Sequence, residues 1–135
     1  MKKNLWINRM ARFTLVACIM TLCVATVFAA TPRHIALSNF YAELSISSLG
    51  YAHCEGSAVV TIGYTADATL ELQQKDGSTW DTVKTWADSG SAVSFEKGYF
   101  VEDGFDYRLK ITAKVYNENG KLIESPAAYS NVCSY

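Results

Sequence analysis

Residues 101–125 read VEDGFDYRLKITAKVYNENGKLIES and contain the clearest strand pattern of the chain. Between Tyr107 and Val115, apolar residues alternate with charged or polar ones, which is the pattern of a strand with one buried face. An Asn-Gly pair at 119–120 follows, and such a pair is typical of the tight turn in a β-hairpin. The stretch therefore predicts a half-buried antiparallel strand whose chain turns back beside it. Its inward-facing residues are Tyr107, Leu109, Ile111, Ala113 and Val115.

The same alternation recurs in the chain that precedes this stretch, and turn signals separate the runs. In the second run it places Ala58, Val60 and Ile62 on one face. No segment after residue 30 has a helical period, so the sequence predicts an all-β fold. About seven short strands in a chain of this size favour a two-sheet antiparallel sandwich. The runs are 42–50, 54–64, 68–74, 80–86 and 91–95.

The segment VEDGFDYRLKITA, residues 101–113, resembles the corner and following strand of fibronectin type III and immunoglobulin-like domains. The shared spacing places an apolar residue, Val101, three positions before Gly104 and six before Tyr107. Alternating apolar residues and an Ala then follow. The resemblance implies a structural tyrosine corner, in which the Tyr107 hydroxyl bonds to the backbone upstream and Gly104 permits the tight turn. It also implies that residues 69–83 form the hairpin of the third and fourth strands.

The first 29 residues have the composition of a secretory signal peptide. Four basic residues and no acid occur in residues 1–12, an apolar run follows, and small residues end it near Ala29. We therefore expect a signal peptide at 1–29, a single sandwich domain at 30–135 and a secreted, extracellular bacterial protein. Two alternatives stay open: the run is long enough to be retained as an anchor, and LVAC at 15–18 matches a lipoprotein acylation box. A membrane is a partner only in those two cases.

Charge limits the partners that we expect. Removing residues 1–29 leaves eight basic residues against thirteen acidic ones, a net charge near −5. Nucleic acids attract basic surfaces, so this balance argues against them. The expected partner is an unidentified protein or glycan at the cell surface.

Two cysteines, Cys54 and Cys133, lie outside the predicted signal peptide. An even number of cysteines in an exported chain predicts a disulfide, with two buried thiols as the alternative. In the sandwich that the resemblance implies, Cys54 begins the second strand and Cys133 ends the last. Both positions then lie at one end of the sandwich, on opposite sheets.

The sequence predicts no enzyme, no cofactor and no metal site. The chain has two histidines, and His53, the one beside Cys54, points to the opposite face of a strand from that cysteine. There is no phosphate-binding loop, zinc spacing or serine nucleophile motif. Glu102, Asp103 and Asp106 could supply oxygen ligands to Ca²⁺, although a solvated acidic turn is the simpler interpretation.

Aromatic residues are the candidate binding residues. In the run 80–86, strict alternation places Trp80 and Trp86 on one face, where they could stack on a sugar ring or anchor a protein. Tyr116 and Asn119 lie at the tip of the hairpin at 116–120, and sandwich domains commonly bind through loops. The alternative is that the tryptophans complete the core and that the Asn-Gly pair only forms the turn.

These observations favour a small secreted non-enzymatic binding or adhesion module. The alternative is a secreted structural subunit or inhibitor that assembles through a strand edge or an aromatic face. A glycan binder predicts two exposed, coplanar tryptophans, and an edge-assembling protein predicts an uncovered terminal strand.

Overall fold

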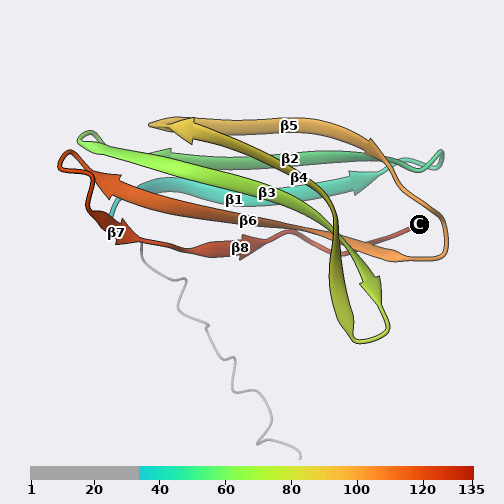
Figure 1. The fold of residues 1–135 in the computed structure, drawn as a ribbon. Helices are drawn as coiled ribbons and strands as arrows, with labels where there is room; N and C mark the ends of the chain where they lie inside the picture. Colours follow the sequence, from blue (N-terminus) through green and yellow to red (C-terminus); the bar gives the residue numbers. More distant parts are fainter. Residues whose placement is uncertain (1–33) are drawn as a thin grey trace, which may run out of the picture. The chain divides into compact units, whose positions relative to one another are not determined.

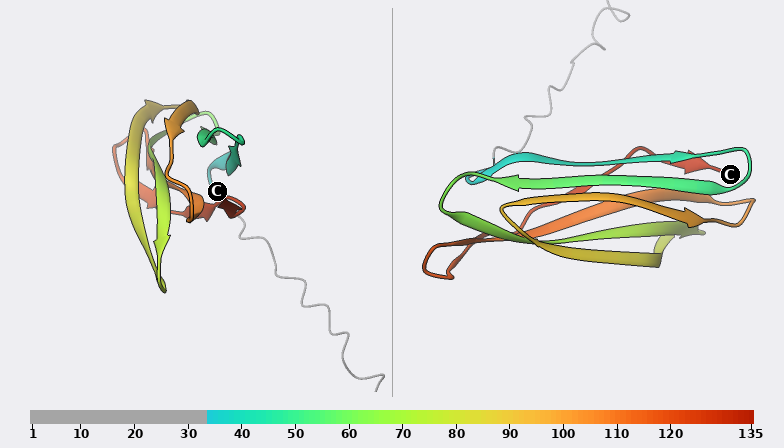
Figure 2. Two further views of the ribbon diagram at one scale, coloured as in Figure 1. Left: turned by 90° about the vertical axis from the view of Figure 1, so that its right-hand side faces the viewer. Right: turned by 90° about the horizontal axis from the view of Figure 1, so that it is seen from above.

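The computed structural model describes residues 34–135, and the predicted signal peptide at 1–29 lies outside the described residues. The described chain contains only strands and turns, arranged in two antiparallel sheets (Figures 1 and 2). This confirms the predicted all-β two-sheet sandwich. Within residues 34–135 there is no helix long and apolar enough to cross a membrane.

The first sheet has three strands in the order β1-β2-β5, and the second is built around β3 and β6. In the second sheet β4 lies at one edge, and three short strands, β7, β8 and β9, pair in turn with β6 along the other. The first sheet comprises β1 (Leu37–Ile46), β2 (Tyr51–Val60) and β5 (Ala92–Phe100). The second comprises β3 (Tyr64–Asp76), β4 (Thr79–Gly90), β6 (Asp106–Asn117), β7 (Leu122–Glu124), β8 (Ala127–Tyr129) and β9 (Cys133–Ser134).

The final edge is divided because Pro126 interrupts it. Proline has no N–H to donate to a neighbouring strand, and its carbonyl instead accepts the N–H of Ala113 at 3.1 Å.

The core lies between the sheets and consists of the alternating residues of β6 and their partners. All five predicted inward residues of β6 are at most 1 % exposed. Three of them, Leu109, Ile111 and Ala113, pair with residues of β3 that are equally buried, namely Leu72, Leu70 and Ala68. Two clusters of buried residues make up the hydrophobic core of residues 34–135.

Polar side chains close one side of the sandwich, where β1 meets the second sheet. The Glu124 carboxylate of β7 accepts the backbone N–H groups of Ile35, Ala36 and Leu37 at 2.8–3.3 Å. Further along, the Asn131 amide group both accepts the N–H of Leu44 and donates to its carbonyl. Asn131 thus pairs with the outer edge of β1 much as a neighbouring strand would.

The Glu124 contacts predict an acid-dependent loss of stability. Burial raises the pKa of Glu124, but the hydrogen bonds from the N–H groups of Ala36, Ile35 and Leu37, together with the nearby His34, lower it by more in total. The pKa therefore lies below its ordinary 4.5. A carboxyl whose pKa is lower in the folded state stabilises the fold above the unfolded-state value and loses that effect as the pH falls through the folded value. We expect Glu124→Gln to cost about 1 kcal/mol near neutral pH and to flatten the decline in stability below pH 4.5.

Urea unfolding at a series of pH values measures this effect. Glu118→Gln, a change on an exposed hairpin residue, is the matched control. Equal acid dependence in wild type and Glu124→Gln would refute the role of this carboxylate.

Candidate functional site: the open side between β4 and β5

The side of the sandwich opposite Glu124 is open, because β4 and β5 separate there. The chain crosses from β4 to β5 at Ser91, after which the two strands diverge (Figure 1). The tip of the β3–β4 hairpin projects away from the sheets in Figure 1 and in the left view of Figure 2. The divergence leaves a hollow of about 160 Å³. Its lining residues are Gln74, Val83, Tyr99, Phe100, Val101, Glu102 and Tyr107.

The corner that joins β5 to β6 supports this hollow. Tyr107 is fully buried, and its hydroxyl donates to the Glu102 carbonyl at 2.7 Å. It also donates to Gln74 Oε1 at 3.3 Å. Gly104 has a φ of +86°, a conformation that L side chains rarely adopt. Tyr107 and Gly104 thus have the geometry that the tyrosine corner requires, and they fix the position of Glu102 at the rim.

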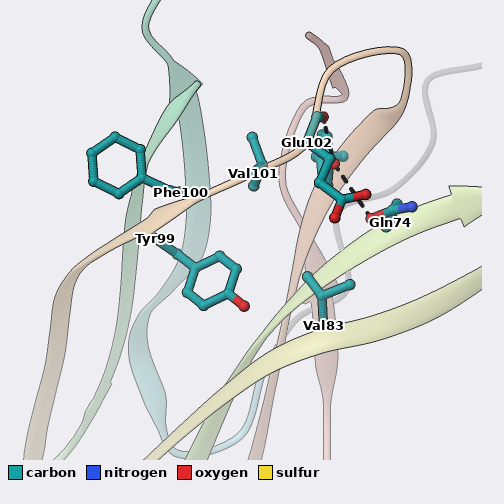
Figure 3. A pocket seen from close by; sticks show the side chains of 7 residues that line it. Gln74, Val83, Tyr99, Phe100, Val101 and Glu102 are labelled. Carbon is teal, nitrogen blue, oxygen red and sulfur yellow. Dashed lines mark hydrogen bonds between the residues drawn. The ribbon is translucent and has the colours of Figure 1, made fainter. Parts of the chain in front are cut away.

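The wall of the hollow mixes apolar and polar groups. Tyr99 and Phe100 leave β5 on opposite sides, and Tyr99 is directed towards Val83 of β4 (Figure 3). Glu102 and Gln74 provide a carboxylate and a carboxamide at one end (Figure 3). Such a lining can hold an apolar side chain and bond to a polar backbone or side chain beside it.

β5 itself presents a free backbone edge to this side. Ser91 and Val101 flank β5, and the backbone groups of both bond to the β2 side. Val60 N–H donates to the Ser91 carbonyl, and Val101 N–H donates to the Gly50 carbonyl. Because hydrogen-bonding direction alternates along an antiparallel strand, the odd-numbered residues of β5 direct their N–H and C=O groups to β2. The even-numbered residues direct theirs to the free edge. The outward set is Ala92, Ser94, Glu96, Gly98 and Phe100. No hydrogen bond within residues 34–135 covers this edge.

Two exposed aromatic rings lie beside the free edge, on the outer face of the first sheet. Phe100 is 70 % exposed and Tyr51 is 42 % exposed, and their rings meet edge to face at a centroid distance of 5.0 Å. Tyr51 lies across Gly98, where even a Cβ atom would collide with its hydroxyl group. Sequence reasoning did not single out Tyr51, although its place opposite Phe100 follows once β2 and β5 are paired.

The two candidate tryptophans do not share a face, and this corrects the sequence prediction. A register shift between Leu72 and Gln73 leaves Val83 as an extra residue in β4. The bulge reverses the alternation, so Trp86 pairs with Leu70 and packs against the core. Trp80 pairs with Lys75 on the outer face. The two rings therefore cannot form one platform for a sugar.

Trp80 instead belongs to a stack on the outer face of the second sheet. The Arg108 guanidinium lies over the Trp80 ring at 4.2 Å and over the Tyr129 ring at 4.4 Å. The Arg108 Nε–H also donates to Gln73 at 2.9 Å. One face of Trp80 is thus already occupied by an intramolecular cation–π contact.

Tyr116 and Asn119 lie at the other end of β6 from the hollow. Asn117 Oδ1 accepts the N–H groups of Asn119 and Lys121, both at 3.0 Å, and so stabilises the turn. A shallow depression between this turn and the β2–β3 loop is lined in part by Ile62 and Tyr64. The structure therefore separates the candidate residues Tyr116 and Asn119 from Trp80 and Trp86.

Cys54 and Cys133 are free thiols in the structure, so it does not contain the predicted disulfide. Both cysteines do lie near one position, Leu44 of β1. Cys54 pairs with Leu44 from one side, and the Cys133 thiol contacts the Leu44 carbonyl at 3.3 Å from the other. That carbonyl faces Asn131 and not β2, so Cys54 and Cys133 approach Leu44 of β1 from its two different edges. The sequence argument placed the cysteines at one end but did not anticipate the intervening strand.

The two thiols should differ strongly in reactivity. Burial raises the pKa of Cys54 to about 12, which leaves little thiolate at mildly alkaline pH. We expect iodoacetamide to modify Cys133 in the folded protein and Cys54 only after unfolding. Mass spectrometry of residues 30–135, alkylated without reductant, measures this. Two cysteines that resist alkylation even in denaturant would instead establish a disulfide.

Tyr99, Glu102 and Tyr107 are the titratable residues among those that line the hollow, and no histidine or cysteine lines it. His53 Nε2 lies 2.9 Å from Glu55 Oε1, on the outer face of the first sheet. No group of three His, Cys, Asp or Glu residues within 34–135 is arranged to hold a metal ion. Asp106, in the acidic corner, accepts a hydrogen bond from the Ser134 hydroxyl.

Comparison with known proteins gives one weak structural similarity. No protein-family model and no curated protein matches the chain. Among solved structures, the solution structure of CsgH from R. palustris is similar with a TM-score of 0.38 and 8 % sequence identity. The alignment covers 67 % of this chain and 90 % of that chain. A similarity at this level supports no inference about function.

Proposed function

We propose that this chain is a secreted, non-enzymatic binding or adhesion module that recognises a protein or glycan outside the cell. The sequence of residues 1–29 supports export, because its basic start, apolar run and small-residue end are those of a signal peptide. The net charge near −5 of the remaining chain disfavours nucleic acids as partners.

We further propose that the sandwich is of the fibronectin type III kind. The strand order supports this, because the fourth strand pairs with the third and the fifth pairs with the second. The Tyr107–Glu102 hydrogen bond lies in the connection between the fifth and sixth strands, where a tyrosine corner is expected. Function does not follow from the fold, since such sandwiches have many functions.

The observation that carries the binding proposal is the difference between the two sides of the sandwich. Glu124 and Asn131 occupy the backbone groups on the β1 side. On the β5 side the backbone edge is free, a hollow lies behind it, and Phe100 is exposed beside it. Exposed aromatic residues next to unpaired backbone groups are common at protein-binding sites.

A second function, assembly as a structural subunit or inhibitor through a strand edge, is favoured by the same free edge. β5 is a nine-residue edge strand without proline, and such a strand is a template for pairing with another chain. The two functions differ in whether the partner is a separate protein or glycan, or a component of an assembly.

A binding screen tests the proposal. Residues 30–135 are applied to arrays of glycans and cell-surface proteins, with Phe100→Ala and Trp80→Ala as matched aromatic variants. We expect a specific partner whose binding weakens about tenfold or more in Phe100→Ala and changes little in Trp80→Ala. The absence of any specific partner, or a loss confined to Trp80→Ala, would contradict the proposed site.

A further inference from the structure

We infer that the free edge of β5 binds an extended peptide segment of a partner protein as an added strand. The segment carries basic residues on its outer face and apolar residues on its inner face. This inference rests on the proposed binding function and specifies its ligand. The juxtaposition that carries it is the free edge of β5 between an acidic row on the outer face and the hollow on the inner face.

The backbone of β5 sets which residues of an added strand point where. In a strand, the residues that direct N–H and C=O groups to one edge also direct their side chains to one face. In β5 the outward-bonding residues, such as Glu96 and Phe100, have their side chains on the outer face. The residues of an added antiparallel strand that bond to them must therefore also place their side chains on the outer face.

The outer face requires positive charge at this position. Glu43, Glu55 and Glu96 lie directly opposite one another across β1, β2 and β5. Like charges in such cross-strand positions repel. Glu55 contacts His53, but neither Glu43 nor Glu96 forms an ion pair within residues 34–135. A basic side chain opposite Glu96 would extend this row with the opposite charge.

The inner face requires apolar side chains. Val83, Tyr99 and Val101 line the hollow that an added strand would face. Lys97 is in the inward phase of β5 but is exposed, because the sandwich is open there. Its charge disfavours basic residues on the inner face of the added strand. The alternation of basic and apolar residues is thus fixed from both faces.

A second copy of this chain is a poor occupant of the edge. Pairing of β5 with β5 would bring a second row of glutamates beside the first on the same continuous sheet, and these charges would repel. Charges on an edge strand are also the usual means by which proteins avoid self-pairing. The complementary occupant is therefore a basic partner segment.

The probe for this inference is a synthetic lysine–valine alternating peptide as long as β5, nine residues. We expect it to bind residues 30–135 and to slow amide exchange at Ser94, Glu96 and Gly98, whose N–H groups face outward. Val93 and Phe95 already face β2, so their exchange should not change. Glu96→Lys should weaken binding roughly fivefold to tenfold, whereas Glu118→Lys, with the same charge change at the far turn, should not.

Two N-methylated forms of the peptide separate strand pairing from simple charge attraction. Methyl groups on the backbone nitrogens of the lysine residues remove the N–H groups that face β5 and should weaken binding about tenfold or more. Methyl groups on the backbone nitrogens of the valine residues lie on the edge of the peptide that faces away from β5 and should be tolerated. Equal effects of the two forms, binding indifferent to Glu96→Lys, or no binding would overturn the inference. Self-association of the chain that protects the same amides without peptide would also overturn it.

The screen described above separates this inference from the proposed function. A partner that requires Phe100 while the lysine–valine peptide fails would leave the binding function standing and remove the strand-addition mode. Failure of both the screen and the peptide would remove both proposals.

Discussion

Leu70→Ala is expected to lower the free energy of unfolding by about 4 kcal/mol. Leu70 is fully buried at the centre of β3, between Trp86 of β4 and Ile111 of β6. Its truncation removes apolar contacts and leaves a cavity that a close-packed two-sheet core cannot fill by small shifts. Urea unfolding followed by tryptophan fluorescence measures the loss. A domain of this size has a total stability of about 5–15 kcal/mol, so the variant should be near the limit of folding.

Gly56 provides a specific control for this prediction. A Cβ atom at this position would lie 3.1 Å from Leu70 Cδ1 and 3.3 Å from Ile111 Cδ1, both tighter than ordinary contacts. Gly56→Ala alone should therefore cost about 1–2 kcal/mol. In Leu70→Ala the added methyl group points into the new cavity, so the double variant should be less destabilised than the sum of the two single changes by about 1 kcal/mol. Strict additivity would refute the close approach of the two sheets at Gly56.

The alternation of residues 107–115 was sufficient to predict which side of β6 is buried. One face of this strand meets the core and the other meets solvent, so its sequence reports its environment directly. The same reasoning fails at Ile62, which is in phase with Val60 but fully exposed. β2 ends at Val60, and the chain turns before Ile62 reaches the sheet. A local pattern does not show where a strand ends.

The face of Trp80 could not be derived from the strand that contains it. The bulge at Val83 arises from the register of β4 against β3, which depends on the pairing of two strands. The closure of the β1 side is equally non-local, because Asn131 and Leu44 are 87 residues apart. The free edge of β5 emerges only from comparison with that closed side. The candidate site was therefore only partly predictable: the corner formed by Gly104 and Tyr107 stood out in the sequence, but the hollow and the free strand edge beside it did not.

Tyr107→Phe is expected to lower the free energy of unfolding by about 2 kcal/mol near neutral pH. The change keeps the buried ring and removes only the hydroxyl group. The Glu102 carbonyl and Gln74 Oε1 then lose their donor at 2.7 and 3.3 Å. Because these two residues also line the hollow, the variant should loosen the rim of the candidate binding site as well.

A pH series distinguishes loss of this hydrogen bond from a general packing defect. Burial is the main cause that raises the pKa of Tyr107 above its ordinary 10.0, and the bond to Glu102 lowers it by less. A group with a raised folded-state pKa stabilises the fold fully below the unfolded-state value, and this contribution is lost as the pH rises through the folded-state value. The wild type should therefore lose stability above pH 10, and Tyr107→Phe should lose less. Urea midpoints across this range measure the difference. Parallel alkaline declines in the two proteins, together with an unchanged midpoint at neutral pH, would show that the Tyr107 hydroxyl does not hold the corner.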